Sequence, residues 1–192
     1  MIARFTRTAV LAASLAAVPL LHAAEVAGVK VDEQIKVDGH DLILNGAGLR
    51  SKVFIKVYVG ALYVTQKASA PAALIDAATP RRMTLRLLRD IDADTLYGAL
   101  YDGLKGNHGE AELAALKPQI DQFAEIMKKI GNARSGDTVA IDFAADGVAV
   151  GFNGEVRGRV PGIDFARALL KVWLGEKVND ARLRDALLGR AQ

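Results

Sequence analysis

The chain has 192 residues, of which 51% are hydrophobic and 24% are charged, a composition typical of a globular domain rather than a disordered segment. It contains no cysteine, which excludes disulfide bonds, thiolate chemistry and cysteine metal sites. The formal net charge is +3 at pH 7, but the basic residues are dispersed and have no aromatic residues interleaved with them. Nucleic acid is therefore not an expected partner.

Residues 1–24 have the pattern of a secretory signal peptide. Two arginines precede an apolar stretch over residues 9–21, which is well short of the roughly 20 residues that span a bilayer. Small residues allow cleavage after Ala23 or Ala24, and the remaining chain has a net charge of about +1. We therefore expect one domain over residues 25–192, located in the periplasm without stable membrane insertion. An uncleaved N-terminal anchor is the alternative.

The first part of the domain predicts β-structure. Residues 26–31 alternate between apolar and polar side chains, as in a half-buried strand. Residues 34–37 and 41–44 flank Asp38-Gly39, a dipeptide typical of a tight hairpin turn. We expect a strand followed by a hairpin.

A longer strand is expected over residues 52–65, because its second half is apolar on both faces and is therefore predicted to be central and covered on both sides. Gly60 within it predicts a bulge or the close approach of a bulky group. Ser69 is a candidate cap for a short helix over residues 71–78. Residues 82–89 alternate again and predict a half-buried strand.

The hydrophobic period then becomes helical. Asp92 or Asp94 can cap a helix that carries Leu96, Leu100 and Leu104 at four-residue steps. A second helical stripe starts at Glu110 and lasts about five turns, and Pro118 is expected to kink it or split it into two helices.

The last part of the chain predicts a second hairpin, another strand and two helices. The hairpin strands are residues 139–143 and 148–152, and residues 155–160 form the further strand. The helices are residues 163–174 and 180–188, each followed by glycine. The whole pattern predicts one α+β domain, an antiparallel sheet with helices packed largely on one face.

Familiar active-site motifs are missing. His40 and His108 lie in separate turn-like segments, and no serine lies in a GxSxG elbow. The glycines of residues 46–48 precede a β-branched and aromatic run, whereas a dinucleotide loop must open a helix. The aspartates within residues 90–94 lack the glycine and distal glutamate of a calcium loop. We expect neither a metal nor a cofactor.

Arg50 is the strongest candidate for a binding residue. It follows the flexible pair Gly46 and Gly48 and precedes the long apolar strand. Its guanidinium keeps its charge, and its planar fork suits a carboxylate or another oxyanion. A fixed cation beside an apolar layer is what a receptor for an amphiphilic acid requires. The alternative is an ordinary ion pair with Asp41, Asp90 or Asp92.

Four segments of the chain carry a resemblance to a known family. They are Asn45-Gly46-Ala47-Gly48-Leu49-Arg50, Lys56-Val57-Tyr58-Val59-Gly60-Ala61-Leu62-Tyr63, Leu88-Arg89-Asp90-Ile91 and Phe165-Ala166-Arg167-Ala168-Leu169-Leu170-Lys171-Val172-Trp173-Leu174-Gly175. In this order they resemble the chalcone isomerase-like family, and more narrowly its secreted bacterial branch. The resemblance implies an open-faced β-sandwich, in which a layer of helices covers one face of a large antiparallel sheet and a ligand cleft lies between them.

The same resemblance implies two kinds of function. Some members of the family cyclise chalcones to flavanones, whereas others bind fatty acids or assist polyketide enzymes without catalysis. The cleft arginine shared by enzymes and fatty-acid binders corresponds to Arg50. The enzymes carry a threonine on the next strand, where this chain has Tyr58, and that departure resembles the fatty-acid binders.

The helical part of the catalytic set matches less well. The enzymes carry a tyrosine and an asparagine two helical turns apart, and Tyr97 corresponds to the tyrosine. The residue seven positions later is Leu104, although Asn107 lies nearby. Tyr101 lies one turn beyond Tyr97 and is a further candidate to line the cleft.

The ligand-binding set predicted in this way comprises Arg50, Tyr58, Tyr97, Tyr101 and Asn107, with no catalytic residue assigned. Phe54, Leu85 and Leu87 are candidates to line the cavity for the apolar tail. Tyr63, five residues after Tyr58, is expected on the opposite face of the strand and in the core, and Trp173 is also expected in the core.

Three functions remain open at this stage. The first is a periplasmic, non-catalytic binder of a fatty acid or similar amphiphilic acid. The second is a weak isomerase of the chalcone–flavanone type, that is, an intramolecular lyase. The third is an interaction module with a protein partner and a vestigial cleft.

Overall fold

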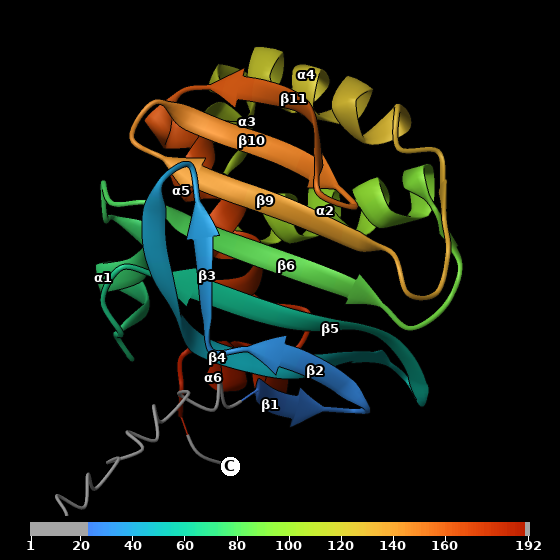
Figure 1. Cartoon of the computed structure of the whole chain (residues 1–192). Coiled ribbons are helices and arrows are strands. Elements are labelled where there is room, and N and C mark those ends of the chain that lie inside the picture. Colours follow the sequence, from blue (N-terminus) through green and yellow to red (C-terminus); the bar gives the residue numbers. More distant parts are fainter. Residues whose placement is uncertain (1–22, 191–192) are drawn as a thin grey trace, which may run out of the picture.

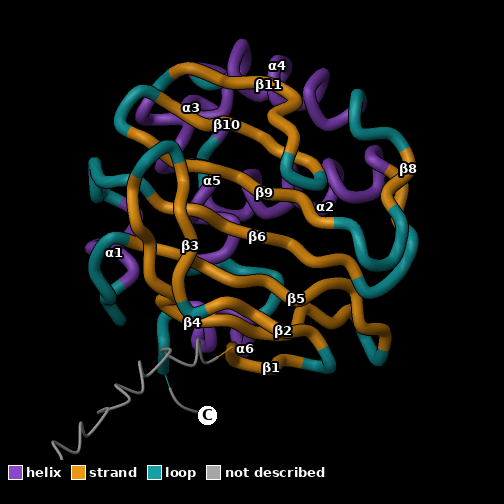
Figure 2. The backbone as a smooth tube through the Cα atoms, in the orientation of Figure 1, coloured by secondary structure: helices purple, strands orange, loops and turns teal. Residues whose placement is uncertain are grey.

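The computed structural model of the protein describes residues 23–190, so most of the predicted signal peptide lies outside the described residues (Figure 1). A seven-stranded antiparallel sheet is its centre, with the strand order β11-β10-β9-β6-β5-β4-β3. The helices lie behind this sheet in the view of Figure 2. This is the predicted α+β architecture.

The large sheet is formed by β3 (Gln34–Val37), β4 (His40–Lys52), β5 (Ile55–Val64), β6 (Arg81–Leu87), β9 (Thr138–Ala144), β10 (Gly147–Phe152) and β11 (Glu155–Pro161). Two short ladders accompany it, β1 (Ala23–Val26) with β2 (Val29–Asp32), and β7 (Ile91–Asp92) with β8 (Asn132–Ala133). The helices are α1 (Pro71–Ile75), α2 (Ala93–Asn107), α3 (Glu110–Ala115), α4 (Lys117–Lys128), α5 (Ile163–Leu174) and α6 (Ala181–Leu187).

Strand alternation gives the sheet two apolar faces. On the helix side, alternate residues of β6, β9 and β10 pack against α2, α4 and α5, and Phe123 and Phe165 are fully buried there. On the other side, Val59, Ala61 and Tyr63 of β5 are buried beneath β2, β3 and the start of β4. Strands β2 and β3 lie in front of the sheet in Figure 1. Fully burying each large apolar side chain contributes about 1.5–3 kcal/mol, so both layers stabilise the fold.

Several predicted elements are confirmed. Asp38-Gly39 is the turn between β3 and β4, and the side chain of Asp92 accepts a hydrogen bond from the Thr95 amide at the start of α2. The helical stripe after residue 110 is split into α3 and α4, with Pro118 in the first turn of α4, where a missing N–H costs nothing.

Other boundaries were predicted wrongly. Residues 26–31 are not one strand, because Ala27 and Gly28 form the turn between β1 and β2. The strand expected from Lys52 begins at Ile55, since Lys52 is the end of β4. The short helix α1 follows Ala70 without a side-chain cap, so Ser69 does not cap it.

A buried cation closes the end of α1. Arg81 is 1% exposed, and its Nη1 donates hydrogen bonds to the carbonyls of Leu74 and Ile75, which the helix leaves unpaired. Its Nε and Nη2 have no hydrogen-bond partner among the described residues. Burial, assisted by the neighbouring charge of Arg167, lowers the pKa of Arg81 to about 10.

Helix α6 lies unusually close to strand β4. A Cβ atom at Gly46 would come within 2.0 Å of the Ala186 carbonyl oxygen, and one at Gly48 within 2.7 Å of the Ala186 Cβ. The buried Asn45 donates hydrogen bonds to the carbonyls of Leu187 (2.7 Å) and Ala68 (3.0 Å). The Asn-Gly-x-Gly segment is therefore the seat of α6.

We predict that Gly46→Ala lowers the free energy of unfolding by about 2 kcal/mol or more, because the added methyl group meets fixed backbone. Gly98→Ala is the control: it lies within α2 with open space around the new Cβ, so it is expected to raise stability by up to about 1 kcal/mol. Urea unfolding of both variants measures the difference. Equal stability of the two variants would show that α6 does not depend on this seat.

Candidate functional site

A cavity of about 700 Å³ lies on the helix side, at the end of the β4–β5 hairpin. Helices α2 and α5 and the start of α6 complete its wall. Its apolar lining comes from Ile55, Val57, Ile91, Leu96, Ala99, Leu100, Val172, Trp173, Val178 and Leu183. The volume lies within the range of about 300–1,000 Å³ that is usual for small-molecule sites.

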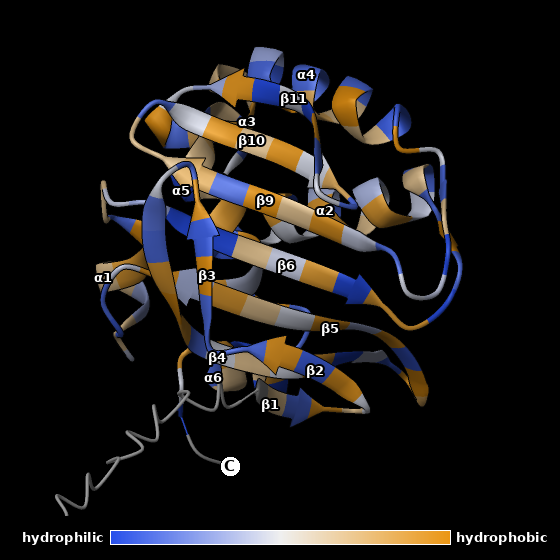
Figure 3. Ribbon diagram, viewed as in Figure 1, coloured by the Kyte–Doolittle hydropathy of each residue, from blue (hydrophilic) through white to orange (hydrophobic). Residues whose placement is uncertain are grey.

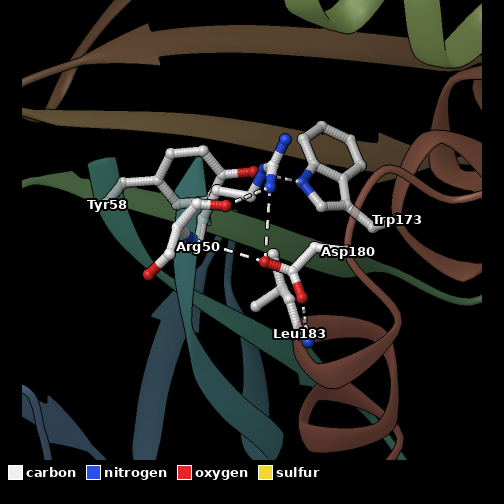
Figure 4. Close-up of polar contacts among 6 residues, drawn as sticks. Arg50, Tyr58, Trp173, Asp180 and Leu183 are labelled. Atoms are coloured by element: carbon white, nitrogen blue, oxygen red, sulfur yellow. Dashed lines mark hydrogen bonds and ion pairs between the residues drawn. The ribbon is translucent and has the colours of Figure 1, made fainter. Parts of the chain in front are cut away.

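Arg50 lies at the polar end of this cavity. Because α6 packs closely on Gly46 and Gly48 of β4, Asp180 at the start of α6 lies beside Arg50. Its Nη1 is 3.3 Å from Asp180 Oδ2 and donates a second hydrogen bond, of 2.5 Å, to the Ser51 carbonyl. No contact occupies its Nε and Nη2 among the residues that the structure describes. In Figure 4 one terminal nitrogen faces Asp180 and the other points away from it. Two donor nitrogens of the guanidinium are therefore free for a ligand.

Asp180 is fixed by more than the ion pair. It caps α6, where its Oδ1 accepts a hydrogen bond of 3.1 Å from the Leu183 amide, and its Oδ2 also accepts one of 3.3 Å from the Ser51 amide. The Arg50 and Asp180 side chains are only 19% and 15% exposed. A half-buried pair of this kind is held more firmly than a surface ion pair. Asp180 was not predicted as the partner of Arg50, although a helix was predicted to begin there.

Tyr58 faces the same cavity from the neighbouring strand. It is directly opposite Arg50 in the β4–β5 ladder, so both side chains lie on one face. The ladder shifts by one residue between Arg50 and Ser51, which leaves Val57 as the extra residue of a bulge. Val57 and Tyr58 therefore both line the cavity, although adjacent strand residues normally point to opposite faces.

The hydroxyl group of Tyr58 is tied to the only tryptophan of the chain. Trp173 Nε1 donates a hydrogen bond of 3.0 Å to Tyr58 Oη, and both side chains are buried (Figure 4). Burial raises the pKa of Tyr58 to about 12, although the Trp173 hydrogen bond and the charge of Arg50 oppose this rise. Tyr58 is therefore a neutral phenol at pH 7, with its own O–H free to donate to a ligand.

Charged residues surround the mouth of the cavity. Lys52 and Arg89 are exposed cations on its rim. Asp90 and Asp92 are on the rim too, but they accept hydrogen bonds from the Ser135 and Thr95 amides and thereby order the nearby backbone.

Only part of the predicted site is assembled. Arg50 and Tyr58 meet at the cavity, whereas Tyr97, Tyr101 and Asn107 are not among the residues that line it. Tyr97 and Tyr101 stack on each other with ring centroids 5.9 Å apart.

The three remaining candidates have other contacts. Tyr97 also packs against Phe123 of α4, with ring centroids 6.1 Å apart. Asn107 joins the end of α2 to the loop after α5, because its amide donates to the Lys177 carbonyl (3.0 Å) and accepts from the Lys177 amide (3.1 Å). These three residues therefore pack or hydrogen-bond outside the cavity, and their part in ligand binding stays a prediction.

The residues expected to line the tail cavity were predicted wrongly. Leu85 and Leu87 are buried in the core and do not reach the cavity, and Phe54 is 97% exposed in the β4–β5 turn. Trp173 was expected in the core and is buried, yet its indole also forms part of the cavity wall. Tyr63 lies on the opposite face of β5 from Tyr58, as alternation predicts.

Among residues 23–190, no three His, Asp or Glu side chains are grouped closely enough to hold a metal ion. Within the same range, no helix is long and apolar enough to cross a membrane.

The raised pKa of Tyr58 predicts how stability depends on pH. The unfolded chain releases this proton near pH 10.0, whereas the folded protein keeps it until about pH 12. The free energy of unfolding should therefore be unaffected by this group below pH 10 and fall as the pH rises from about 10 toward 12. Tyr63, whose pKa burial also raises to about 12, acts in the same direction.

Urea unfolding at a series of pH values measures this dependence. Tyr58→Phe should reduce the fall between pH 10 and 12, and at neutral pH it should cost about 1–3 kcal/mol, because the buried Trp173 N–H loses its acceptor. An unchanged alkaline slope in Tyr58→Phe would contradict the burial of the phenol.

Comparison with known proteins identifies the family and the fold. The family model described as "Chalcone isomerase-like" matches residues 23–189. No curated protein matches the chain. Among solved structures, the fatty-acid binding protein AtFAP1 of Arabidopsis thaliana has a similar fold, with a TM-score of 0.66 and 16% sequence identity over 84% of this chain and 92% of that one. The chain belongs to the chalcone isomerase-like family.

Proposed function

We propose that the protein binds a fatty acid or a similar amphiphilic acid in the cavity beside Arg50. One observation carries this proposal: two unpaired donors of Arg50 and the free O–H of Tyr58 meet at one end of an otherwise largely apolar cavity of about 700 Å³. A carboxylate needs such donors, and an acyl chain needs such walls. The apolar surface supplies affinity, and the few polar groups orient the ligand.

Arg50 would bind the carboxylate through Nε and Nη2, while Nη1 stays on Asp180 and the Ser51 carbonyl. Hydrogen bonds to an ionised partner are roughly twice as strong as neutral ones, and the low polarity of the surroundings strengthens them further. The Tyr58 O–H would donate to the same head group. Because the pKa of Tyr58 is raised to about 12, this donor remains present at any physiological pH.

Asp180 sets a limit on affinity. Its carboxylate is 3.3 Å from Arg50 Nη1 and repels a second carboxylate that approaches the same guanidinium. Asp180 holds Arg50 in place and competes weakly with the ligand's carboxylate for the guanidinium. The ion pair therefore favours reversible binding of the acid over permanent retention.

The comparisons support an acid as the ligand, since a protein with a similar fold is named for fatty-acid binding. The signal-like residues 1–24 support export to the periplasm and membership of a secreted bacterial branch of the family. We therefore place the proposed binding activity in that compartment.

We expect Arg50→Gln to weaken binding of palmitate by at least about tenfold, because hydrogen bonds to a charged group contribute about 1.5–3 kcal/mol. Trp173 lines the cavity and is the only tryptophan, so its fluorescence can follow the titration. Arg86→Gln is the matched control, since Arg86 lies outside this cavity and donates to Thr138. Equal palmitate affinity in both variants, with the fold intact, would refute the role of Arg50.

Asp180→Asn should act in the opposite direction and tighten palmitate binding several-fold, because it removes the competing negative charge and keeps an oxygen that can cap α6. Asp180→Ala separates the two roles of the side chain. It should lose about 1 kcal/mol of stability through the missing cap, whereas Asp180→Asn should lose less. Weaker binding in Asp180→Asn would show that the carboxylate orients Arg50 more than it competes with the ligand.

A further inference from the structure

The turn between β4 and β5 exposes an apolar tip. Val53, Phe54 and Ile55 are 82%, 97% and 52% exposed. The turn projects beyond the rest of the sheet at the lower right of Figure 1, and the same end is coloured as hydrophobic in Figure 3. Exposure of three adjacent apolar side chains at a protruding end is unfavourable in water, and such a patch is typical of a site that binds another molecule or a membrane.

The conformation of this turn is also unfavourable for its sequence. Val53 has φ 58°, a left-handed conformation that a β-branched residue rarely adopts. Of the four other two-residue turns between paired strands of the described range, Ala27-Gly28, Asp38-Gly39 and Asn153-Gly154 have glycine at the second position, the residue that suits such hairpins, and Ala145-Asp146 does not. Val53-Phe54 departs from those three turns, because it keeps a β-branched residue at positive φ, where glycine would be less strained, and a second apolar residue beside it.

Positive charge flanks the tip on both sides. Lys52 and Lys56 are exposed, and neither side chain has a hydrogen bond or ion pair with any residue of the described range. Arg89 adds a third exposed cation on the adjoining rim. An apolar tip between cations fits a surface that is apolar beneath and anionic above, which is the arrangement of a bilayer that contains acidic phospholipids.

The tip is continuous with the candidate site, because Lys52, Ile55 and Val57 line the cavity. We propose that the β4–β5 turn inserts Phe54 into the interface of an anionic phospholipid bilayer, and that the acid passes between membrane and cavity while the protein is docked there. Docking rests on the exposed turn and its flanking cations, independently of the proposed function. The transfer of an acid rests on the proposed function.

A lipid surface fits this tip better than a protein partner does. A stable protein interface buries roughly 800 Å² on each side and is built around a broad patch. A two-residue turn is narrow and convex, and only three apolar residues are exposed on it. Insertion into a fluid interface needs no complementary surface.

Vesicle co-sedimentation of residues 23–192 tests docking without any fatty acid. This protein contains every described element and both hydrophobic clusters, and it omits the apolar leader. We expect it to bind vesicles of equal parts phosphatidylcholine and phosphatidylglycerol, and to bind pure phosphatidylcholine less. Phe54→Ser should lower the partition coefficient by roughly tenfold or more. Val156→Ser, a 60% exposed residue on β11, is the matched control and should bind as the unaltered protein does.

A second pair of variants tests the charge. Replacement of both Lys52 and Lys56 by glutamine should remove the preference for phosphatidylglycerol, and added salt should have the same effect on the unaltered protein. Replacement of Lys128 and Lys129 by glutamine changes the net charge equally at the end of α4 and should leave the preference intact.

The outcomes separate this inference from the proposed function. Failure of the unaltered protein to bind anionic vesicles, or equal losses in Phe54→Ser and Val156→Ser, would overturn docking even if palmitate binds. A soluble protein captured through Phe54 in the absence of vesicle binding would overturn it too. Vesicle binding without palmitate binding would uphold docking and refute the acid ligand.

The transfer step has its own measurement. The rate at which a fluorescent fatty acid moves from protein to vesicles should rise with vesicle concentration, and this dependence should be lost in Phe54→Ser. A rate independent of vesicle concentration in the unaltered protein would mean that the acid leaves through water, which contradicts exchange in the docked state.

Discussion

The close contact between helix α6 and strand β4 is the constraint on which the site depends. Gly46 and Gly48 on β4, and Gly60 opposite Gly48 on β5, leave no side chain between the strands and the helix. Asn45 then holds the end of α6, and Arg50 meets Asp180 at its start. Helix α6 is thereby fixed to β4 at both of its ends. Gly46, Gly48 and Arg50 are alternate residues of β4, so they lie on the same face of the strand.

This arrangement explains why a charged pair can persist at the edge of an apolar layer. Taking an arginine and an aspartate out of water costs free energy, which only well-placed partners offset. Here each member has further hydrogen bonds to backbone: Arg50 to the Ser51 carbonyl, and Asp180 to the Ser51 and Leu183 amides. Arg81 is a contrast within the same fold, since two of its nitrogens have no partner and its pKa falls to about 10.

The sequence was sufficient for the architecture, because alternation and helical stripes depend on local spacing. It predicted the Asp38-Gly39 hairpin and the position of α5 in this way, and it narrowed the cap of α2 to Asp92 or Asp94, of which Asp92 is the cap. The resemblance to a family supplied Arg50 and Tyr58 as neighbours. The pairing of Arg50 with Asp180 joins residues 130 positions apart, and no local pattern reports such a contact.

The differences between the expected and observed positions have a common physical origin. Tyr97 and Asn107 were chosen by position along a helix, but which face of that helix meets the sheet depends on how α4 and the loop after α5 pack against it. Leu85 and Leu87 were correctly expected to face the helices. That face of the sheet borders the packed core in one part and the cavity in another, and these two residues lie in the core. Side-chain volume in three dimensions decides between them. Phe54 was assigned to a strand, and the turn that exposes it became visible only when the β4–β5 register was known.

The bulge beside Arg50 has a consequence for how the hairpin can vary among related chains. Strand residues change face at every step, so one residue inserted into or deleted from the paired part of β4 or β5 between Arg50 and Tyr58, outside the Val53-Phe54 turn, would turn one of the two away from the cavity unless the bulge vanished with it. An added or removed cross-strand pair beyond the bulge, by contrast, would leave both side chains where they are. The reach of the tip is therefore free to lengthen or shorten in steps of whole pairs, while the head-group end of the cavity stays unchanged.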